Sequence, residues 1–135
     1  MTERPENPSK ALNPFGALVG LAFASCEKGF SRFVLEVRDA LMNPHRVLHG
    51  GAFYAMADTG MGHALYTLLG EGEMCATVEV KINYFGPVRS GTLTCDTRVV
   101  HKGRKLATLE SEVRNGERLV AKALGTYYIF TPQIS

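Results

Sequence analysis

The residues with the types and spacing to do chemistry lie in one short stretch, Asn43 to Asp58, which reads NPHRVLHGGAFYAMAD. Two adjacent glycines, Gly50 and Gly51, stand just before the apolar pattern of a helix. The first N–H groups of a helix have no partner inside it and favour negative charge, so this end can polarise a carbonyl or hold an oxyanion. Glycine also lets a ligand approach the backbone closely. A simple passage from loop to helix is the other interpretation of this pair.

Asp58 is the acid that accompanies these glycines. At about 100° per residue it lies on the border of the helix's apolar stripe. A carboxylate there is expected to be partly desolvated and suited to act as a base or a nucleophile. The alternative is an ordinary surface acid on the flank of the helix.

The spacing of the two groups adds a constraint. Gly50 and Asp58 are eight residues apart, which is ~12 Å along a helix. Reacting atoms must come within ~3–3.5 Å, so the carboxylate cannot attack a carbonyl held at the start of its own helix. If both groups act on one substrate, they come from two copies of the chain with antiparallel helices. The spacing therefore predicts at least a homodimer.

Other catalytic arrangements have less support. His45 and His49 are four residues apart, but they precede the helix and no HExxH motif accompanies them. Asp58 and His63 lie about 140° apart around the helix, so they do not share a face and we expect no metal site. No serine stands in a GxSxG turn, which leaves a Ser-His-Asp triad without support. Nothing in the sequence calls for a cofactor.

One long helix must carry this stretch. From Gly51 onward, apolar residues recur at i, i+3, i+4 and i+7 and form one stripe, which Gly70 and Gly72 close. Several members of the stripe are small and would let a sheet approach closely. The stripe consists of Phe53, Met56, Ala57, Gly60, Met61, Ala64, Leu65 and Leu68.

Alternating patterns on both sides of the helix predict strands. Residues 15–24 predict a short helix that runs into a strand, and a second strand runs from Phe30 to near Asn43-Pro44. After the helix, four alternating segments follow. The first places Val78, Val80, Ile82 and Tyr84 on one face, and the others lie at 93–99, 106–113 and 119–127.

The turns between these last segments are short, at Gly86-Pro87, Lys102–Arg104 and Asn115-Gly116. Consecutive strands with short turns predict an antiparallel meander. A single helix with one wide apolar stripe needs a sheet curved around it. The predicted fold class is therefore α+β, with a strongly bent antiparallel sheet wrapped around one central helix.

The whole chain sets further bounds. Its 135 residues fit a single domain, with residues 1–14 as a loose N-terminal arm. With 45% hydrophobic and 21% charged residues it has the balance of a soluble globular protein. It lacks both a run of ~20 apolar residues for a membrane span and an apolar leader, so we expect a cytoplasmic protein.

Net charge and cysteine content give two further expectations, one about partners and one about disulfides. The net charge of +2 comes from scattered basic residues, which argues against nucleic acid as a partner. Only the cluster His101–Lys105 (HKGRK) is suited to a smaller anion. The three cysteines, Cys26, Cys75 and Cys95, are far apart and are expected to pack as small hydrophobes rather than form disulfides.

Asn43, His49-Gly50-Gly51 and Asp58 in the following helix resemble the hot-dog-fold thioesterases, in particular the PaaI-like (phenylacetyl-CoA thioesterase-like) branch. The segment VEVKINYFGPVRSG, from Val78 to Gly91, is similar to the strand and turn that follow the helix in that family. So are HKGRKLATLESEV and GERLVAKALGTYYI further along. The resemblance extends from about Leu35 to Phe130, most of the chain.

This resemblance implies a hot-dog fold and hydrolysis of an acyl-CoA thioester to a free acid and CoA. Asp58 would be the general base or nucleophile, and the backbone N–H of Gly50 (or Gly51) would polarise the thioester carbonyl. Asn43 and His49 would shape the loop, and the hydroxyl of Thr77 would help to place the water. Family members are usually homodimers or homotetramers built as dimers of dimers.

The substrate would meet two further groups of residues. Basic residues in turns are candidates for the phosphates of CoA, with Arg best suited to bidentate contacts; these are Arg89, Lys102, Arg104 and Lys105. The helix and the seam between two copies would line the acyl pocket. Its candidates are Gly51, Phe53, Tyr54, Met61 and Leu65.

Two alternatives stay open. A hydratase or dehydratase on the same fold would need a paired histidine and acid over the acyl chain, which the downstream loop does not offer convincingly. A non-catalytic acyl-CoA-binding protein would keep the basic residues and need no acid at Asp58. The sequence leaves open the acyl group, the choice between base and nucleophile for Asp58, and the choice between dimer and tetramer.

Overall fold

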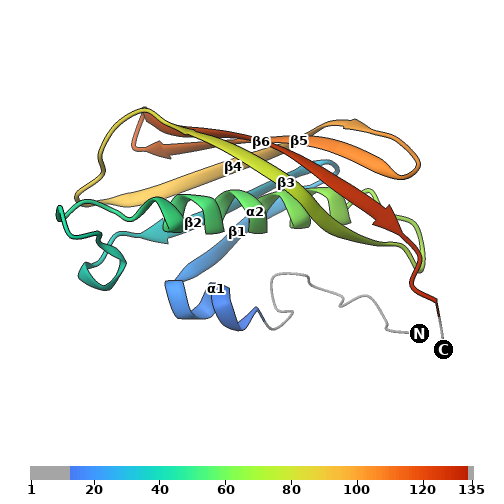
Figure 1. Ribbon diagram of the computed structural model, residues 1–135, viewed down its shortest axis with the longest axis horizontal. Coiled ribbons are helices and arrows are strands. Elements are labelled where there is room, and N and C mark those ends of the chain that lie inside the picture. Colours follow the sequence, from blue (N-terminus) through green and yellow to red (C-terminus); the bar gives the residue numbers. More distant parts are fainter. Residues whose placement is uncertain (1–12, 134–135) are drawn as a thin grey trace.

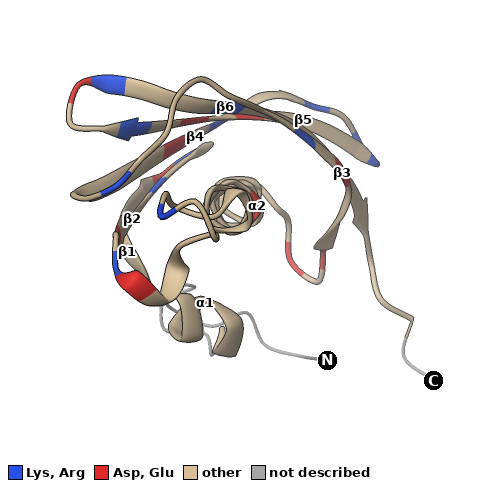
Figure 2. Cartoon of the chain, turned by 60° about the vertical axis from the view of Figure 1, so that its left-hand side comes forward, with Lys and Arg blue, Asp and Glu red and all other residues tan. Residues whose placement is uncertain are grey.

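The computed structural model describes residues 13–133, and its centre is the helix α2 (Gly50–Tyr66). Six antiparallel strands form one sheet that curves around this helix, as the end-on view in Figure 2 shows. Charged residues lie on the sheet, on its turns and on the loops that flank α2, whereas α2 itself carries a single one, Asp58. The predicted α+β class, with a bent antiparallel sheet around one central helix, is confirmed.

The elements follow one another along the chain as labelled in Figure 1. Before α2 come α1 (Pro14–Val19), β1 (Leu21–Glu27), β2 (Phe30–Glu36) and the 3-10 turn η2 (Asp39–Leu41). After α2 come β3 (Met74–Tyr84), β4 (Thr92–Lys102), β5 (Leu106–Asn115) and β6 (Arg118–Phe130). The predicted short helix running into a strand corresponds to α1 and β1.

The predicted N-terminal arm lies outside the described residues as far as residue 12. Its last two residues, Asn13 and Pro14, are the N-cap and the first residue of α1. Asn13 caps that helix by accepting a hydrogen bond from the Gly16 amide over 3.0 Å, and Pro14 is its first residue. Proline suits this position because its fixed backbone angle is already helical.

The strand predicted from Phe30 ends at Glu36, well before Asn43-Pro44. The extension was wrong because the Val37 amide makes the last bond to the β4 side, to the Gly91 carbonyl, and the backbone then folds into a turn. The Leu41 amide donates to the Arg38 carbonyl over 3.0 Å, which closes the turn η2. The chain reverses direction only at residues 43–47, where Met42 and Leu48 form an isolated antiparallel bridge, so the turn predicted at Asn43-Pro44 is present. Residues 37–49 form the loop that precedes α2.

The helix α2 begins and ends through side-chain hydrogen bonds. His49 is its N-cap, and Nδ1 of this residue accepts a hydrogen bond from the Gly51 amide over 2.8 Å. The helix stops at Tyr66, before the predicted end at Gly70 and Gly72. Thr67 accounts for this difference. Its hydroxyl accepts a hydrogen bond from the Gly29 amide over 2.8 Å, which holds the end of the helix to the turn between β1 and β2.

The predicted stripe of α2 is buried against the sheet. All its members up to Leu65 are fully or almost fully buried, and Ala52 and Ala55 are buried as well. The closest approach is at Gly60, where a Cβ would lie only 2.6 Å from Oγ1 of Thr97 on β4. Thr97 itself is fully buried and shares a 2.7 Å hydrogen bond with the Ser111 hydroxyl. A side chain of any size at Gly60 would therefore push the helix off the sheet.

The strand order is β1-β2-β4-β5-β6-β3. Strands β4, β5 and β6 form the predicted meander, and a tight turn with Gly116 at a φ of 64° joins the last two. The prediction that β3 pairs with β4 was wrong, because β3 pairs with β6 and β4 pairs with β2. This order places β3 at one edge of the arc and β1 at the other, so the sheet covers α2 on both sides (Figure 2).

A β-bulge interrupts β3. Thr77 pairs with Tyr127 and Glu79 pairs with Thr126, so Val78 is an extra residue in the ladder. The predicted common face of Val78, Val80, Ile82 and Tyr84 is therefore broken: Val80 and Ile82 pack against the core, whereas Val78 is 58% exposed. The alternation failed here because a bulge shifts the side chains on one side of it relative to those on the other.

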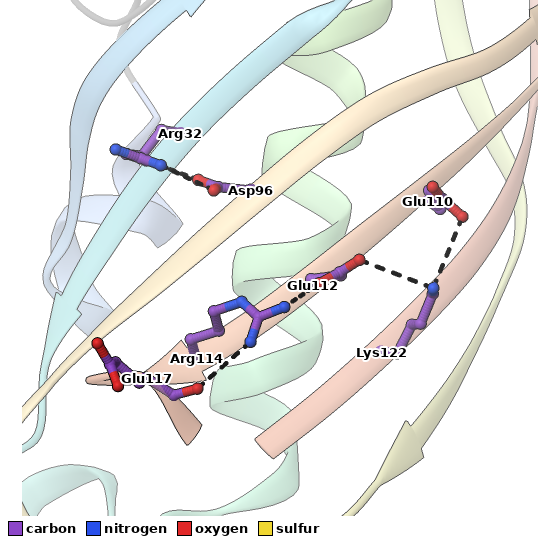
Figure 3. Close-up of polar contacts among 7 residues, drawn as sticks. All are labelled: Arg32, Asp96, Glu110, Glu112, Arg114, Glu117 and Lys122. Atoms are coloured by element: carbon purple, nitrogen blue, oxygen red, sulfur yellow. Dashed lines mark hydrogen bonds and ion pairs between the residues drawn. The ribbon is translucent and has the colours of Figure 1, made fainter. Parts of the chain in front are cut away.

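The convex face of the sheet carries ion pairs, several of which Figure 3 shows. Arg32 on β2 contacts Asp96 on β4 over 2.6 Å, and Arg114 contacts Glu112 over the same distance along β5. Such exposed pairs contribute little to stability and keep the outer face hydrated. Within residues 13–133, no helix is long and apolar enough to cross a membrane.

Candidate active site

Asp58 lies near the middle of α2, and its carboxylate faces the part of the sheet formed by β3 and β6. The hydroxyl of Thr77 donates a hydrogen bond to Oδ1 of Asp58 over 2.7 Å. The hydroxyl of Tyr127 reaches the same oxygen over 2.5 Å and the backbone carbonyl of Asp58 over 2.8 Å. The two contacts with Oδ1 have the lengths expected of hydroxyl groups that donate to a carboxylate. Asp58 is therefore a fixed, hydrogen-bonded acid rather than a free surface residue.

Tyr127 was not predicted as a site residue from the sequence. Only 3% of this residue is exposed, and its burial raises the pKa of the phenol above its usual value, as does its hydrogen bond to Asp58. The hydroxyl therefore keeps its proton and acts as a donor. One signal was available, because a buried tyrosine usually directs its hydroxyl at a partner. The partner could not be named without the pairing of β3 with β6.

Cys75 stands two residues before Thr77 and packs against the core beside Asp58. Burial raises the pKa of its thiol, and the nearby charge of Asp58 raises it further. The group is thus held as a neutral thiol, which makes it a poor nucleophile. Cys95 on β4 is fully buried, and this burial raises the pKa of its thiol to about 12, whereas Cys26 is exposed. All three cysteines are free.

The N-terminus of α2 presents one unused donor. The Gly51 amide is taken by Nδ1 of His49, and the His49 amide donates to the Leu41 carbonyl over 2.9 Å. In the described chain, no group accepts a hydrogen bond from the Gly50 amide. Of the two amides that the sequence could not separate, only that of Gly50 is free to bind a carbonyl oxygen.

The loop before the helix is organised by Asn43. Its side-chain oxygen accepts hydrogen bonds from the amides of His45 (2.9 Å) and Val47 (3.4 Å). The backbone amide of Asn43 donates to the Val47 carbonyl over 2.8 Å. Arg46 within this loop has a φ of 65°, a conformation unusual for a residue other than glycine. These bonds fix the path of the chain that leads to His49 and Gly50.

A hollow of about 430 Å³ opens beside this loop. Its lining includes Asn43, Gly50 and Phe53 of the predicted site, together with Tyr84 at the end of β3. The Tyr84 hydroxyl donates to the Gly50 carbonyl over 2.9 Å, and its ring meets Phe53 edge-on with the ring centres 5.4 Å apart. Tyr84 was predicted to lie in a strand, but its contact with Gly50 was not predicted. Asp58 does not line the hollow.

A model of the thioesterase superfamily matches residues 45–122, more than half of the chain. The chain belongs to the thioesterase superfamily. The match spans Gly50, Asp58 and Thr77 and ends before Tyr127. The resemblance to the PaaI-like hot-dog thioesterases is confirmed, and the protein is a thioester hydrolase.

Individual relatives agree with this placement. A Saccharolobus solfataricus protein named as a candidate esterase is 32% identical over 115 residues, covering 83% of this chain and 75% of the relative. The acyl-coenzyme A thioesterase PaaI of Escherichia coli is 26% identical over 101 residues, which cover 74% of this chain and 70% of the Escherichia coli protein. A solved structure of a conserved Pseudomonas aeruginosa protein has a TM-score of 0.87 at 35% identity, covering 94% of this chain and 100% of that one.

The residues predicted to line the acyl pocket of this thioesterase fall into two groups. Gly51 and Tyr54 are exposed on the open side of α2, and Phe53 borders the hollow although only 3% of it is exposed. Met61 and Leu65 are completely buried in the core. They have no surface left to meet a ligand and instead support the helix from behind.

The four basic residues predicted to contact CoA lie in two separate places, one of them at the Gly50 end of the candidate site and three at the Asp58 end. Arg89 follows Val88, which lines the hollow at the Gly50 end. Lys102, Arg104 and Lys105 lie at the β4–β5 turn. In the sheet, Lys102 pairs with Ala107, Ala107 with Tyr127, and Tyr127 with Thr77, so this turn lies at the Asp58 end. All four basic residues are exposed.

The described residues of the thioesterase contain no group of three or more His, Cys, Asp or Glu side chains placed to hold a metal ion. The polar groups of the candidate site form two separate clusters. One holds the Gly50 amide, ordered by Asn43 and His49, and the other holds Asp58, ordered by Thr77 and Tyr127. Both lie on α2, about 12 Å apart along its axis.

Proposed function

We propose that this thioesterase hydrolyses an acyl-CoA thioester to a free acid and CoA, in sites shared between two copies of the chain. The observation that carries the proposal is the placement of an ordered carboxylate, Asp58, and a free amide donor, Gly50, on one helix. They are ~12 Å apart, too far to act together on one carbonyl group, because reacting atoms must come within ~3–3.5 Å. A second copy with its helix antiparallel supplies the missing group.

In the composite site, the Gly50 amide of one copy donates to the thioester oxygen and stabilises the negative charge that develops there. Asp58 of the other copy takes a proton from a water molecule as this water attacks the carbonyl carbon. The carbon–sulfur bond then breaks, the CoA thiolate leaves and is protonated, and the acid is released. The Thr77 hydroxyl donates to Asp58, and its lone pairs can accept a hydrogen bond from the same water.

A second course uses the same residues. The Asp58 carboxylate attacks the carbonyl carbon itself, and the departing thiolate leaves an acyl anhydride on the enzyme. Water then hydrolyses the anhydride, which returns the carboxylate and releases the acid. Both courses consume one thioester and one water and yield one acid and one thiol.

The edge strand β3 supports association of two copies. It is 11 residues long, and within the described chain it pairs on one side only, with β6. Apolar side chains on and beside it are exposed, including Met74 (43%), Val78 (58%) and Tyr54 on α2 (39%). A free edge of this length and character invites pairing with another chain. An antiparallel pair of β3 strands would also set the two α2 helices antiparallel, in a homodimer or a dimer of dimers.

The basic residues support CoA as the thiol component. Arg89 lies at the Gly50 end of the chain, and Lys102, Arg104 and Lys105 lie at the Asp58 end. An antiparallel pair would bring the Arg89 loop of one copy and the β4–β5 turn of the other to the same composite site. Exposed Arg and Lys side chains in turns are well suited to the pyrophosphate and 3′-phosphate of CoA. Gly51, Phe53 and Tyr54 are the candidates for contact with the acyl chain.

Purified protein with a panel of short, long and aromatic acyl-CoAs and a thiol reagent tests the proposal. We expect release of free CoA from at least one substrate, and a loss in kcat on the order of 10² or more in Asp58→Asn. Asp96→Asn, which removes an acid from the outer face, is the control and should keep normal activity. Binding without CoA release across the panel would favour an acyl-CoA-binding protein. Consumption of an unsaturated acyl-CoA without release of the thiol would favour a hydratase.

A further inference from the structure

We propose that Tyr127 is a positioning residue of the active site. Together with Thr77 it occupies Oδ1 of Asp58, and this leaves Oδ2 as the oxygen that acts on the substrate or on water. The inference rests on the proposed role of Asp58 and adds to it a residue that lies outside the matched family region.

The donors converge on one oxygen. Thr77 and Tyr127 are directly paired across β3 and β6, so both hydroxyls approach Asp58 from the same part of the sheet. The single hydroxyl proton of Tyr127 has two acceptors within reach, Oδ1 at 2.5 Å and the backbone carbonyl at 2.8 Å. The carboxylate is the stronger acceptor as well as the nearer one. Oδ1 therefore receives two hydrogen bonds.

The other oxygen is left free. No donor among residues 13–133 makes a hydrogen bond to Oδ2 of Asp58. This oxygen is also not sealed from solvent, because the described chain contains no buried side-chain oxygen without a partner. An oxygen that already accepts two hydrogen bonds is a weaker base and nucleophile than one that accepts none. The asymmetry therefore selects Oδ2 as the reacting atom.

Tyr127 is better placed than Thr77 to set this orientation. It projects from β6, which is paired on both sides, and its ring is held in the core with 3% of the residue exposed. Thr77 stands on the edge strand, directly beside the bulge at Val78. Burial also keeps the Tyr127 hydroxyl protonated, by raising its pKa. A donor fixed in this way holds the carboxylate in one orientation before the substrate arrives.

The test is Tyr127→Phe, which removes the hydroxyl and keeps the ring. The matched control is Tyr128→Phe, because Tyr128 is 42% exposed and stacks on Phe130. We expect Tyr127→Phe to lower kcat about 10-fold to 100-fold, since small misplacements of a reacting group have effects of this size. KM should stay within about twofold, because the hydroxyl orients the carboxylate rather than binds the substrate. Tyr128→Phe should leave both constants unchanged.

Three further measurements separate this role from a structural one. Thr77→Val, which removes the second donor to Oδ1, should also lower kcat, whereas Thr77→Ser should retain it. In the Asp58→Asn background, Tyr127→Phe should cause no additional loss, because both residues act through one carboxylate. All rates are measured below the melting temperature of each variant, so a loss of stability alone does not imitate the effect.

The outcomes distinguish the two proposals. If Asp58→Asn is inactive while Tyr127→Phe matches Tyr128→Phe in kcat, the positioning role is refuted and the role of Asp58 stands. An additional loss from Tyr127→Phe in the Asp58→Asn background would also refute it, because the tyrosine would then act elsewhere. Full activity of Asp58→Asn would overturn the proposed function itself.

Discussion

Two inactive variants of this thioesterase should restore activity to each other. The first is Asp58→Asn. The second is Gly50→Pro, which deletes the amide proposed to hold the thioester oxygen. Gly50 is the first residue of α2, where proline is well accepted, and His49 before it is extended (φ −61°, ψ 136°), as a residue preceding proline must be. Gly50→Ala is the matched control, because it keeps the amide while adding the Cβ that would lie 3.1 Å from the Tyr84 hydroxyl.

The size of the rescue follows from the geometry. Alone, Gly50→Pro should lose about 10²–10³ in kcat, and Asp58→Asn on the order of 10² or more. In a symmetric dimer each site takes Gly50 from one copy and Asp58 from the other, so a hybrid has one intact site and one doubly defective site. Hybrids selected with two different affinity tags should therefore show about half the wild-type activity, and a randomised equal mixture about one quarter.

The assay is release of CoA from the best acyl-CoA of the panel, measured on hybrids made by co-expression and purified through both tags. Each variant purified alone gives the background. Hybrids no more active than the two parents would refute the shared site. Gly50→Ala should stay within a few-fold of wild type. An effect as large as that of Gly50→Pro would mean that crowding at Tyr84, rather than the lost amide, inactivates the enzyme.

Two further predictions follow from the packing around α2. Gly60→Ala should lower the free energy of unfolding by about 1–3 kcal/mol and the melting temperature by about 4–10 °C, because its Cβ would meet the buried Thr97 hydroxyl; an unchanged thermal unfolding curve would contradict the close approach of helix and sheet. Cys75 should react with an alkylating reagent more slowly at neutral pH than the exposed Cys26, because burial and the charge of Asp58 raise its pKa above the usual 9.0 and so keep it as the unreactive thiol. Removing that charge in Asp58→Asn should lower the pKa of Cys75 and speed its alkylation, which is measured by mass spectrometry. A rate that stays the same or falls would argue against the proximity of Cys75 and Asp58.

Local patterns in the sequence predicted the parts of the site that lie on one element. Gly50 and Asp58 belong to a single helix, so helical geometry alone set their separation and led to the expectation of a shared site. The buried stripe of α2 followed from the same periodicity. In both cases the information lies in neighbouring residues, and no knowledge of the tertiary structure was needed.

The contacts between strands could not be predicted in this way. Tyr127 meets Thr77 only because β3 pairs with β6 rather than with the next strand, β4, and sequence neighbours pair often but not always. Tyr84 was placed in the correct strand, but its hydrogen bond to Gly50 depends on how the end of β3 crosses the start of α2. Thr77 was proposed only through the family resemblance, because the bulge beside it breaks the alternation on which a prediction from periodicity relies.

The bulge in β3 marks a position where this enzyme should tolerate a shorter chain. Deleting Val78 would change neither the charge of the chain nor any residue that contacts Asp58. Thr77 and Val80 are three residues apart, and they share the inner face of the sheet only because Val78 is an extra residue in the ladder. Without it they would be two residues apart, which is the spacing of one face in a regular strand, so Thr77 would still face Asp58 and Val80 would stay in the core. Aligned relatives that lack a residue here could therefore build the acid's hydrogen bonds from the same positions as this chain.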